Sequence, residues 1–299
     1  MKTLEYFFNQ NMSFRLWGLV GNSTIGNHSL APVVWKHLLN RWKKTTKYFV
    51  LGSDSKEYIE KYFNAMKKNP NVVGFNVARP WKELAFNQCD WVEPIAKEMN
   101  TVNTIIVKDN KFFGFNTDGI GIVNTIKKER NLSNTTVLLL GAGGAAQTVP
   151  YYLTRENVNK IYIVDILEYK AEKITNKYRT SFRNDRIKLV KPRNIKKIID
   201  KVDIIINATP CGMRGYNKEI PLEDDIINLL KPNTFVVEMV YTPFLTPLLE
   251  KALLKDCIVI PGINMLVEQA SESFKYAFSI PVLNKEKEIL ISKCAGASK

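Results

Sequence analysis

A glycine-rich turn after a short apolar strand is the first pattern in this sequence that could do chemistry. The apolar residues 135–140 lead directly into Gly141, Gly143, Gly144 and Ala145, and a helical pattern follows. Glycine allows a tight turn and a close approach of the backbone to a pyrophosphate, and the free N–H groups at a helix start favour anions. Because the spacing is G-x-G-G-x-A rather than G-x-G-x-x-G, a turn that serves only packing is the alternative interpretation.

An acidic residue at the end of the next apolar strand supports a dinucleotide site. Asp165 closes the segment 160–165, 21 residues after Gly144, where a carboxylate can accept hydrogen bonds from ribose hydroxyls. Its negative charge would repel a 2′-phosphate, and residues 166–168 offer no cation to hold one. The sequence therefore predicts NAD as the cofactor, with NADP less favoured. Lys170, one helical turn further on, is the one residue we identified that could still reach such a phosphate.

Alternating apolar strands and amphipathic helices must position these residues, an order typical of an α/β protein with parallel sheets. In the first part of the chain we expect strands at 15–21, 47–53, 72–78 and 101–110, and helices at 31–44, 55–68 and 80–98. In the second part we expect strands at 135–140, 160–165, 202–209, 234–241 and 257–262, and a last helix at 265–278.

These elements predict a two-domain fold around a cleft. Residues 1–118 and 263–299 are expected to form a substrate-binding and catalytic α/β domain, completed by the C-terminal helices. Residues 119–262 are expected to form a Rossmann-type dinucleotide-binding domain, with the dinucleotide across the carboxyl ends of its strands.

Composition is that of a soluble globular protein, with 45% hydrophobic and 24% charged residues among 299. No segment approaches the roughly 20 apolar residues of a membrane span, and residues 1–22 lack a continuous apolar stretch. We therefore expect a cytoplasmic protein that does not act at a membrane. The two histidines and four cysteines are scattered, which predicts neither a metal site nor a disulfide framework.

The formal net charge of +14 raises the question of an anionic partner. Seven of the fifteen residues in 183–197 are basic, but no aromatic residues are interleaved and no nucleic-acid motif accompanies them. We interpret this stretch as a solvated surface that can steer anionic small molecules, and we expect no nucleic-acid partner.

Six segments, in order along the chain, resemble the motifs of one known family. They are GFNVARPWK (74–82), NTVNTIIVKDNKFFGFNTDGIG (100–121), GAGGAA (141–146), INATPCGM (206–213), VVEMVYTPFLTPLL (236–249) and PGINMLVEQA (261–270). The family is that of shikimate dehydrogenase and its quinate-dehydrogenase relatives. Six ordered motifs make a chance match improbable. The resemblance implies hydride transfer between a nicotinamide dinucleotide and a small ring alcohol or ketone.

The resemblance also implies a role for each matching residue. Lys82 and Asp118 match the catalytic pair that flanks the reacting hydroxyl, and such chemistry requires a group that takes or returns the hydroxyl proton. The remaining matches are Ser29, Asn103, Tyr241 and Gln269 for substrate binding, and Thr209, Met213, Gly262 and Met265 on the cofactor side. For several of these positions, a turn-forming, solvated or packing role is the alternative.

Two departures from the family pattern concern the substrate pocket. The first loop of the family reads close to G-x-P-x-x-H-S-x-S-P, and both serines bind the substrate carboxylate. Here the loop 21–32 has two extra residues and keeps Ser29, but Ala31 replaces the second serine. Ala78 replaces the threonine of the N-V-T motif. A buried carboxylate without donors is costly, so another group must supply them or the substrate differs.

Three residues could supply the missing donors. Ser23 and Thr24 lie in the enlarged loop, and Arg79 follows the second substituted position. Arg79 is adjacent to Ala78, and neighbouring strand residues alternate in direction, so we favour an Arg79 that faces solvent.

Three functions fit the sequence. The first is an NAD-preferring dehydrogenase of shikimate, quinate or a related ring acid. The second is a biosynthetic shikimate dehydrogenase that uses NADP, and the third is a ligand-sensing protein that kept the fold without catalysis. Lys82 and Asp118 argue against a sensor, which has no need of that pair. The sequence does not determine the oligomeric state, and a homodimer is one assembly that remains open.

Overall fold

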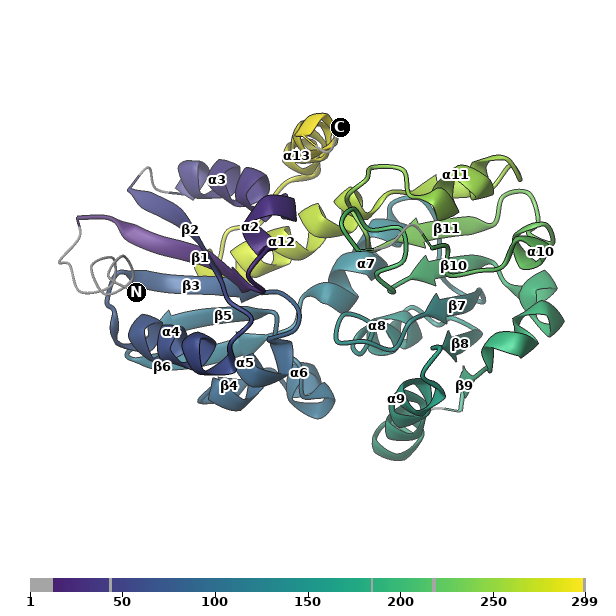
Figure 1. The fold of residues 1–299 in the computed structure, drawn as a ribbon, viewed down its shortest axis with the longest axis horizontal. Coiled ribbons are helices and arrows are strands. Elements are labelled where there is room, and N and C mark those ends of the chain that lie inside the picture. The colour runs from purple at the N-terminus through teal and green to yellow at the C-terminus, as the bar shows by residue number, and fades with distance from the viewer. Residues whose placement is uncertain (1–12, 43–44, 184, 217–218, 298–299) are drawn as a thin grey trace. The chain divides into compact units, whose positions relative to one another are not determined.

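A computed structural model of the chain describes residues 13–42, 45–183, 185–216 and 219–297, and it divides into two compact units (Figure 1). Unit 1 contains the described residues up to Thr117 together with Ala270–Cys294, and unit 2 contains Asp118–Gln269 with the residues from Ala295 onward. Residues 1–12 lie outside the described residues. They begin the segment 1–22, in which the sequence shows no continuous apolar stretch.

Unit 1 is built on a six-stranded sheet in the order β2-β1-β3-β5-β6-β4. Its strands are β1 (Arg15–Gly21), β2 (Thr46–Gly52), β3 (Val72–Val77), β4 (Trp91–Val92), β5 (Thr104–Lys108) and β6 (Lys111–Phe115). The first three strands are parallel as expected, but β5 is antiparallel to both β3 and β6. The single strand predicted at 101–110 is therefore half of a hairpin. It turns at Asp109 and Asn110, whose positive φ values of 51° and 55° suit a two-residue connection.

The helices of unit 1 differ from expectation at residues 25–28, where no helix was predicted, and at 80–98. They are α2 (Ile25–His28), α3 (Ala31–Trp42), α4 (Lys56–Lys68), α5 (Lys82–Gln88), α6 (Pro94–Met99), the second half of α12 (Gly262–Phe278), and α13 (Asn284–Ala297). The single helix expected at 80–98 is wrong, because β4 separates α5 from α6. Asp90 exchanges backbone and side-chain hydrogen bonds with Phe112 of β6, at 2.9 and 2.7 Å, and Pro94 cannot continue a helix.

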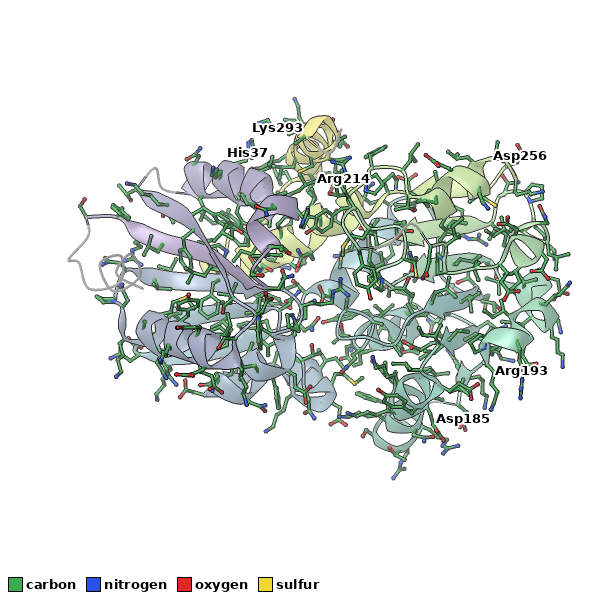
Figure 2. The ribbon with its side chains drawn as sticks, in the orientation of Figure 1. His37, Asp185, Arg193, Arg214, Asp256 and Lys293 are labelled. Atoms are coloured by element: carbon green, nitrogen blue, oxygen red, sulfur yellow. The ribbon has the colours of Figure 1, made fainter. Side chains whose placement is uncertain are left out.

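The C-terminal helix α13 is fastened to α3. Arg41 Nη1 lies 2.5 Å from Glu286 Oε2, and Lys293 Nζ lies 3.0 Å from His37 Nδ1. Figure 2 labels the His37 and Lys293 side chains of α3 and α13. Burial and the nearby Lys293 lower the pKa of His37, which favours a neutral ring at this contact. A segment from the end of the chain thus covers a helix from its beginning.

Aromatic side chains fill the core of unit 1. The Trp17 and Trp35 rings stack with centroids 4.2 Å apart, and Phe63, Phe75 and Phe112 form a second group with centroids 5.5 to 6.2 Å apart. All five side chains are at most 1% exposed. A Cβ on Gly74 of β3 would lie 2.4 Å from the Trp17 ring and 2.6 Å from the Ile105 carbonyl oxygen. Only glycine leaves room for this ring.

Unit 2 is built on a six-stranded, wholly parallel sheet in the order β12-β11-β10-β7-β8-β9. Its strands are β7 (Thr136–Leu140), β8 (Lys160–Val164), β9 (Ile187–Leu189), β10 (Ile204–Asn207), β11 (Phe235–Glu238) and β12 (Ile258–Ile260). Read from the other edge, this is the doubly-wound order of dinucleotide-binding sheets. The predicted parallel sheet is confirmed here. We did not predict β9, which lies inside the basic stretch 183–197.

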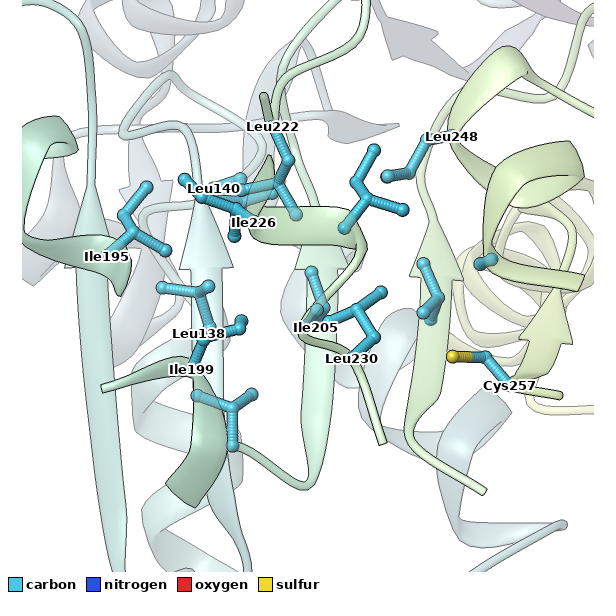
Figure 3. Packing of buried hydrophobic residues seen from close by; sticks show 14 of the residues in the cluster. Leu138, Leu140, Ile195, Ile199, Ile205, Leu222, Ile226, Leu230, Leu248 and Cys257 are labelled. Carbon is cyan, nitrogen blue, oxygen red and sulfur yellow. The ribbon is translucent and has the colours of Figure 1, made fainter. Parts of the chain in front are cut away.

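Helices and 3-10 turns cover this sheet. They are α7 (Asp118–Lys127), α8 (Val149–Arg155), α9 (Glu168–Ser181), η1 (Pro192–Lys197), η2 (Ile199–Lys201), α10 (Asp224–Ile227), α11 (Pro247–Leu253) and the first half of α12. One face of the sheet packs Leu138, Leu140 and Ile205 against side chains such as Leu222 and Leu248 (Figure 3). Strands that are buried on both faces explain the wholly apolar run 137–140.

Three further features bear on function. Among the described residues, no helix combines the length and apolar character needed to cross a bilayer. The same residues contain no cluster of three or more His, Cys, Asp or Glu side chains placed to hold a metal ion. Cys89, Cys211, Cys257 and Cys294 are free thiols.

We predict that Gly74→Ala destabilises unit 1 by about 2 kcal/mol or more, because the new methyl group overlaps the fully buried Trp17 ring and a strand carbonyl. Urea unfolding followed by tryptophan fluorescence measures the change. Gly296→Ala in α13 is the matched control. Its Cβ would meet nothing within 4 Å, so it should be neutral or slightly stabilising. Equal stability of the two variants would contradict this account of the core.

Candidate functional site

The glycine-rich turn leaves β7 at the centre of the unit 2 sheet. Gly141 has φ +96°, donates its N–H to Val164 O at 2.7 Å, and would carry a Cβ only 3.0 Å from the Ala208 backbone. A side chain there would be strained. Gly143 is exposed, and a Cβ on it would meet nothing within 4 Å. The backbone around Gly143 is therefore open to a ligand, as a pyrophosphate cradle requires.

The helix after this turn begins later than a standard dinucleotide turn suggests. Gly144 and Ala145 are half-buried members of a run of turns, and α8 begins only at Val149. The N–H groups next to these glycines therefore belong to turns, and the helix start lies a few residues beyond them.

Asp165 follows β8 and fixes the glycine-rich turn. Its Oδ2 accepts a hydrogen bond from Ala142 N at 2.8 Å, and its Oδ1 accepts one from Leu167 N at 2.9 Å. Each carboxylate oxygen has a second lone pair, so the group can still accept a ribose hydroxyl. The sequence indicated the ribose role but not this structural one.

A cation that sequence reasoning missed pairs with Glu168, three residues after Asp165. Lys191 follows β9, the neighbour of β8, and its Nζ lies 2.8 Å from Glu168 Oε2. Lys191 lies outside residues 166–168, directly after Asp165, on which the cofactor prediction rested. The signal was available in principle, because strand ends that are adjacent in a parallel sheet bring distant residues together. Lys170 is half-buried near the start of α9.

The loop after β10 carries two of the predicted cofactor residues. Asn207 Oδ1 accepts hydrogen bonds from Thr209 N at 3.0 Å and Thr209 Oγ1 at 2.6 Å, and Thr209 Oγ1 accepts one from Cys211 N at 3.2 Å. Met213 is half-buried, and its N–H donates to Pro210 O at 3.1 Å. Thr209 therefore shapes the loop by its own side chain.

The loop after β11 and the start of α12 carry three more predicted residues. Tyr241 is half-buried directly after β11 and Val240. Gly262 opens α12 so close to this loop that a Cβ would lie 2.2 Å from Val240 O. Met265, one turn along α12, is 6% exposed.

Gln269 is the last predicted site residue of unit 2. It is half-buried on α12, where Gly121 of α7 packs against it. A Cβ on Gly121 would lie 2.8 Å from Gln269 Cβ, so the glycine sets how closely the two helices approach.

Glu238, which sequence reasoning did not single out, is fully buried at the end of β11. It accepts hydrogen bonds from Asn207 Nδ2 at 2.9 and 3.0 Å, from Thr246 Oγ1 at 2.8 Å and from Val240 N at 3.2 Å. Burial raises the pKa of Glu238 to about 7, although these hydrogen bonds act to lower it. A polar residue that closes an otherwise apolar strand was the signal that could have identified it.

In unit 1, Lys82 is the first residue of α5 and is half-buried. The preceding Trp81 fixes this helix start, because its indole N–H lies 3.1 Å from Gly21 O and 3.0 Å from Ser53 O. The carbonyl of Lys82 accepts a hydrogen bond from Val102 N at 3.1 Å. Three strand ends of the unit 1 sheet therefore determine where the lysine lies.

Asn103 is 3% exposed and belongs to a buried polar network. Its Oδ1 accepts from Thr104 Oγ1 at 2.9 Å and from Thr117 N at 3.0 Å, and its Nδ2 donates to Thr117 Oγ1 at 3.2 Å. Ser273 of α12 joins at 2.8 Å from Thr104 Oγ1 and 3.1 Å from Thr117 Oγ1. The Asn103 side chain thus holds the segment that precedes Asp118.

Asp118 is the first residue of α7 in unit 2 and is 4% exposed. The next residue, Gly119, donates its N–H to Thr148 Oγ1 at 3.1 Å, and a Cβ on Gly119 would overlap Thr148. The start of α7 is therefore fixed against the segment that follows the glycine-rich turn.

In the loop 21–32, where Ala31 replaces a serine, Ser29 and Ser23 both have hydrogen-bond partners in the protein. Ser29 Oγ accepts the Ala31 N–H at 3.2 Å, and Ala31 itself is 7% exposed at the start of α3. Ser23 donates its hydroxyl and its N–H to Asp54, and the hydroxyl hydrogen bond holds the pKa of Asp54 below its usual range.

The two other residues proposed as donors are Thr24, in the same loop, and Arg79, which follows β3. Thr24 Oγ1 accepts a hydrogen bond from Asn22 Nδ2 at 3.0 Å. Ala78 is half-buried and Arg79 is exposed, as we expected for Arg79, but both follow the end of β3 at Val77, so strand alternation is not the reason. None of these contacts links Ser29 to Lys82 or Asn103. Lys82 and Asn103 are linked by the backbone, because Val102, the neighbour of Asn103, donates its N–H to the carbonyl of Lys82.

An open parallel sheet in doubly-wound order, with a glycine-rich turn after its central strand, defines unit 2 as a Rossmann-type domain. The class of protein is that of the NAD(P)-dependent oxidoreductases. Residues 19–105 match the family model described as "Shikimate dehydrogenase substrate binding domain", and residues 124–215 match "Shikimate / quinate 5-dehydrogenase". The chain belongs to the shikimate dehydrogenase family.

Individual relatives agree with this assignment. The chain is 34% identical over 263 residues to "Shikimate dehydrogenase (NADP(+))" of Staphylococcus aureus strain Newman, with 85% of this chain and 90% of that protein covered. It is 30% identical to a shikimate dehydrogenase of known structure from Aquifex aeolicus, with a TM-score of 0.82 and coverage of 94% and 99%. It is 26% identical to the Listeria monocytogenes shikimate 5-dehydrogenase solved with shikimate and NAD, with a TM-score of 0.79 and coverage of 94% and 98%.

We predict that Glu238 makes stability depend on pH. Because the pKa of Glu238 is raised from 4.5 to about 7, the folded chain binds its proton more tightly than the unfolded chain. The resulting stability is complete below pH 4.5 and is lost as the pH rises through 7. The free energy of unfolding of the wild type should therefore fall across this window, relative to Glu238→Gln, by up to about 3 kcal/mol. Urea unfolding of both proteins measures the difference, and parallel pH profiles would contradict the raised pKa.

Proposed function

We propose that this chain is an NAD-preferring dehydrogenase of ring hydroxy acids of the shikimate and quinate type. The observation that carries the cofactor preference is Asp165, whose carboxylate follows β8 and is fixed beside the glycine-rich turn by Ala142 N and Leu167 N. A carboxylate there accepts ribose hydroxyls and repels a 2′-phosphate. The substrate class is supported by the relatives, which are named for shikimate or bound to it.

In this proposal the turn residues Gly143, Gly144 and Ala145 bind the pyrophosphate through their backbone. Gly141, whose N–H is donated to Val164 O, permits the tight turn that presents them. Unstrained glycine conformations and the open space at Gly143 support these roles. The nicotinamide side is bordered by Thr209, Met213, Gly262 and Met265. When bound, the nicotinamide dinucleotide supplies the hydride acceptor, or the donor in the reverse direction.

Lys82 and Asp118 act on the hydroxyl that reacts. Oxidation of a carbinol carbon requires a group that takes the hydroxyl proton, and reduction requires a group that returns it. In our proposal Lys82 Nζ takes and returns this proton, and the Asp118 carboxylate orients the hydroxyl. Both residues open a helix, where neighbouring hydrogen bonds fix the backbone.

Four residues would hold the ring acid: Ser29, Asn103, Tyr241 and Gln269. The pocket for its carboxylate is atypical, because Ala31 and Ala78 provide no hydroxyl group. The Ser29 hydroxyl accepts the Ala31 N–H, which leaves its own O–H available to a carboxylate. We therefore expect a ring acid to be bound with fewer direct donors than in relatives that keep both hydroxyl residues.

A second candidate is an enzyme that uses NADP. Lys191, which reaches Glu168 beside Asp165, favours it, since a lysine in that region could pair with a 2′-phosphate instead. The Staphylococcus aureus relative is named for NADP. These two observations make the NAD/NADP ratio the quantity to measure.

We predict that purified protein reduces NAD⁺ when shikimate or quinate is offered, and that Lys82→Ala lowers kcat by about 10² to 10⁴. The affinity for NADH should change less than about threefold, because Lys82 has no role in the dinucleotide cradle. Nicotinamide absorbance and a fluorescence titration with NADH measure the two quantities. Normal turnover by the variant would exclude Lys82 as the acid–base group. Silence of the wild type with both acids would exclude this substrate class.

We predict that Asp165→Asn lowers the NAD/NADP ratio of kcat/KM by about tenfold, because the charge that repels a 2′-phosphate is removed. Asparagine retains one oxygen for the turn. Lys191→Ala is the matched variant, and it should raise the same ratio if Lys191 serves NADP. An unchanged ratio in Asp165→Asn would contradict the ribose role of Asp165.

A further inference from the structure

Glu238 is a buried titratable residue in unit 2 that the proposed mechanism does not use. It is the last residue of β11, and its register partner in the parallel ladder is Asn207, the last residue of β10. Both side chains are 0% exposed. Because β10 and β11 are parallel, both residues end at the same edge of the sheet, the edge where the cofactor loops begin.

Through Asn207, the carboxylate sets the loop after β10. The Asn207 amide group donates to both Glu238 oxygens, at 2.9 and 3.0 Å, which fixes the orientation of the amide. The Asn207 oxygen therefore faces Thr209 and accepts its N–H and its hydroxyl. Thr209 in turn accepts the N–H of Cys211.

Through Thr246 and Val240, the same carboxylate sets the loop after β11. The Thr246 hydroxyl donates to Glu238 at 2.8 Å and accepts Leu249 N at 3.4 Å, so that it also caps α11. Val240 N donates to Glu238 at 3.2 Å, and the carbonyl of Val240 is the group against which Gly262 packs. Tyr241 follows directly.

We propose that Glu238 is the positioning residue that holds the two loops and the start of α12 in the geometry that binds the dinucleotide. This inference rests on the proposed function for the roles of Thr209, Tyr241 and Gly262. Glu238 itself touches neither cofactor nor substrate in this account.

The chemistry of the contacts explains why a carboxylate is needed. Amide, hydroxyl and backbone N–H donors converge on two oxygens, and only the ionised carboxylate, which has no donor of its own, satisfies all of them. Because the pKa of Glu238 is raised to about 7, the binding measurements that test this role are made above that pH. Glutamine has nearly the same shape but replaces one oxygen with a donor. That donor would face Asn207 Nδ2 or the Thr246 hydroxyl, and one buried loop contact would be lost.

The test compares wild type with Glu238→Gln and Thr246→Val in the full chain. The dissociation constant for NADH is measured by fluorescence titration well below the melting temperature, beside the melting temperature itself and the KM for NAD⁺. We expect a rise of about tenfold in the NADH dissociation constant for Glu238→Gln and about threefold for Thr246→Val, with KM for NAD⁺ rising in parallel.

Thr135→Val is the matched control for Thr246→Val. Thr135 precedes β7 at the opposite end of the strands, is 4% exposed, and donates its hydroxyl to Leu132 O at 2.7 Å. Its loss should lower the melting temperature as Thr246→Val does, while the NADH dissociation constant remains that of the wild type. If the role of Glu238 is purely structural, Glu238→Gln and Thr246→Val will both behave like this control, with a lower melting temperature and an unchanged NADH dissociation constant.

A folded Glu238→Gln or Thr246→Val variant that binds NADH within about twofold of the wild type would overturn the proposal, and Thr246→Val decides if Glu238→Gln does not fold. A wild type that binds NADH but oxidises neither shikimate nor quinate would contradict the proposed substrate alone. The NADH titrations would then still decide the role of Glu238. A wild type that binds no NADH would contradict the proposed function and this inference together.

Discussion

Parallel strand pairing in unit 2 is the constraint on which the candidate cofactor site depends. Because β7, β8, β10 and β11 run in the same direction, their carboxyl ends reach one edge of the sheet. The glycine-rich turn, Asp165, Asn207 and Glu238 all follow or close these strands. A single geometric rule thus collects residues that lie almost a hundred positions apart.

Polar groups at these strand ends are held by hydrogen bonds to one another. Asp165 ties the glycine-rich turn to the end of β8, and Glu238 ties the loops after β10 and β11 to the start of α12. In unit 1 the Asn103 side chain does the same for the segment before α7. A buried polar network is stable only when its members are satisfied, and it then permits few alternative loop conformations. Such networks give a binding site its fixed shape before any ligand arrives.

The substitutions at Ala31 and Ala78 affect the expected substrate pocket but not the residues expected to carry the reaction. Lys82 and Asp118 lie in segments that resemble the family motifs, whereas Ala31 and Ala78 provide no hydroxyl group, and Ser23 is engaged by Asp54. Family membership therefore describes hydride chemistry better than it describes the ring acid. If a ring acid is the substrate, as we propose, its carboxylate has few donors available, and Ser29 is the first of them to test.

The sequence by itself determined the α/β class, most strand positions, the glycine-rich turn and Asp165, because apolar periodicity and turn residues are local signals. Only the tertiary structure decided that β5 is antiparallel, that β4 interrupts the helix expected at 80–98, and that β9 lies in the basic stretch. It also decided which side chains meet, such as Lys191 with Glu168 and Asn207 with Glu238. Those contacts join segments brought together by sheet order and register, which depend on packing across the whole unit rather than on neighbouring residues.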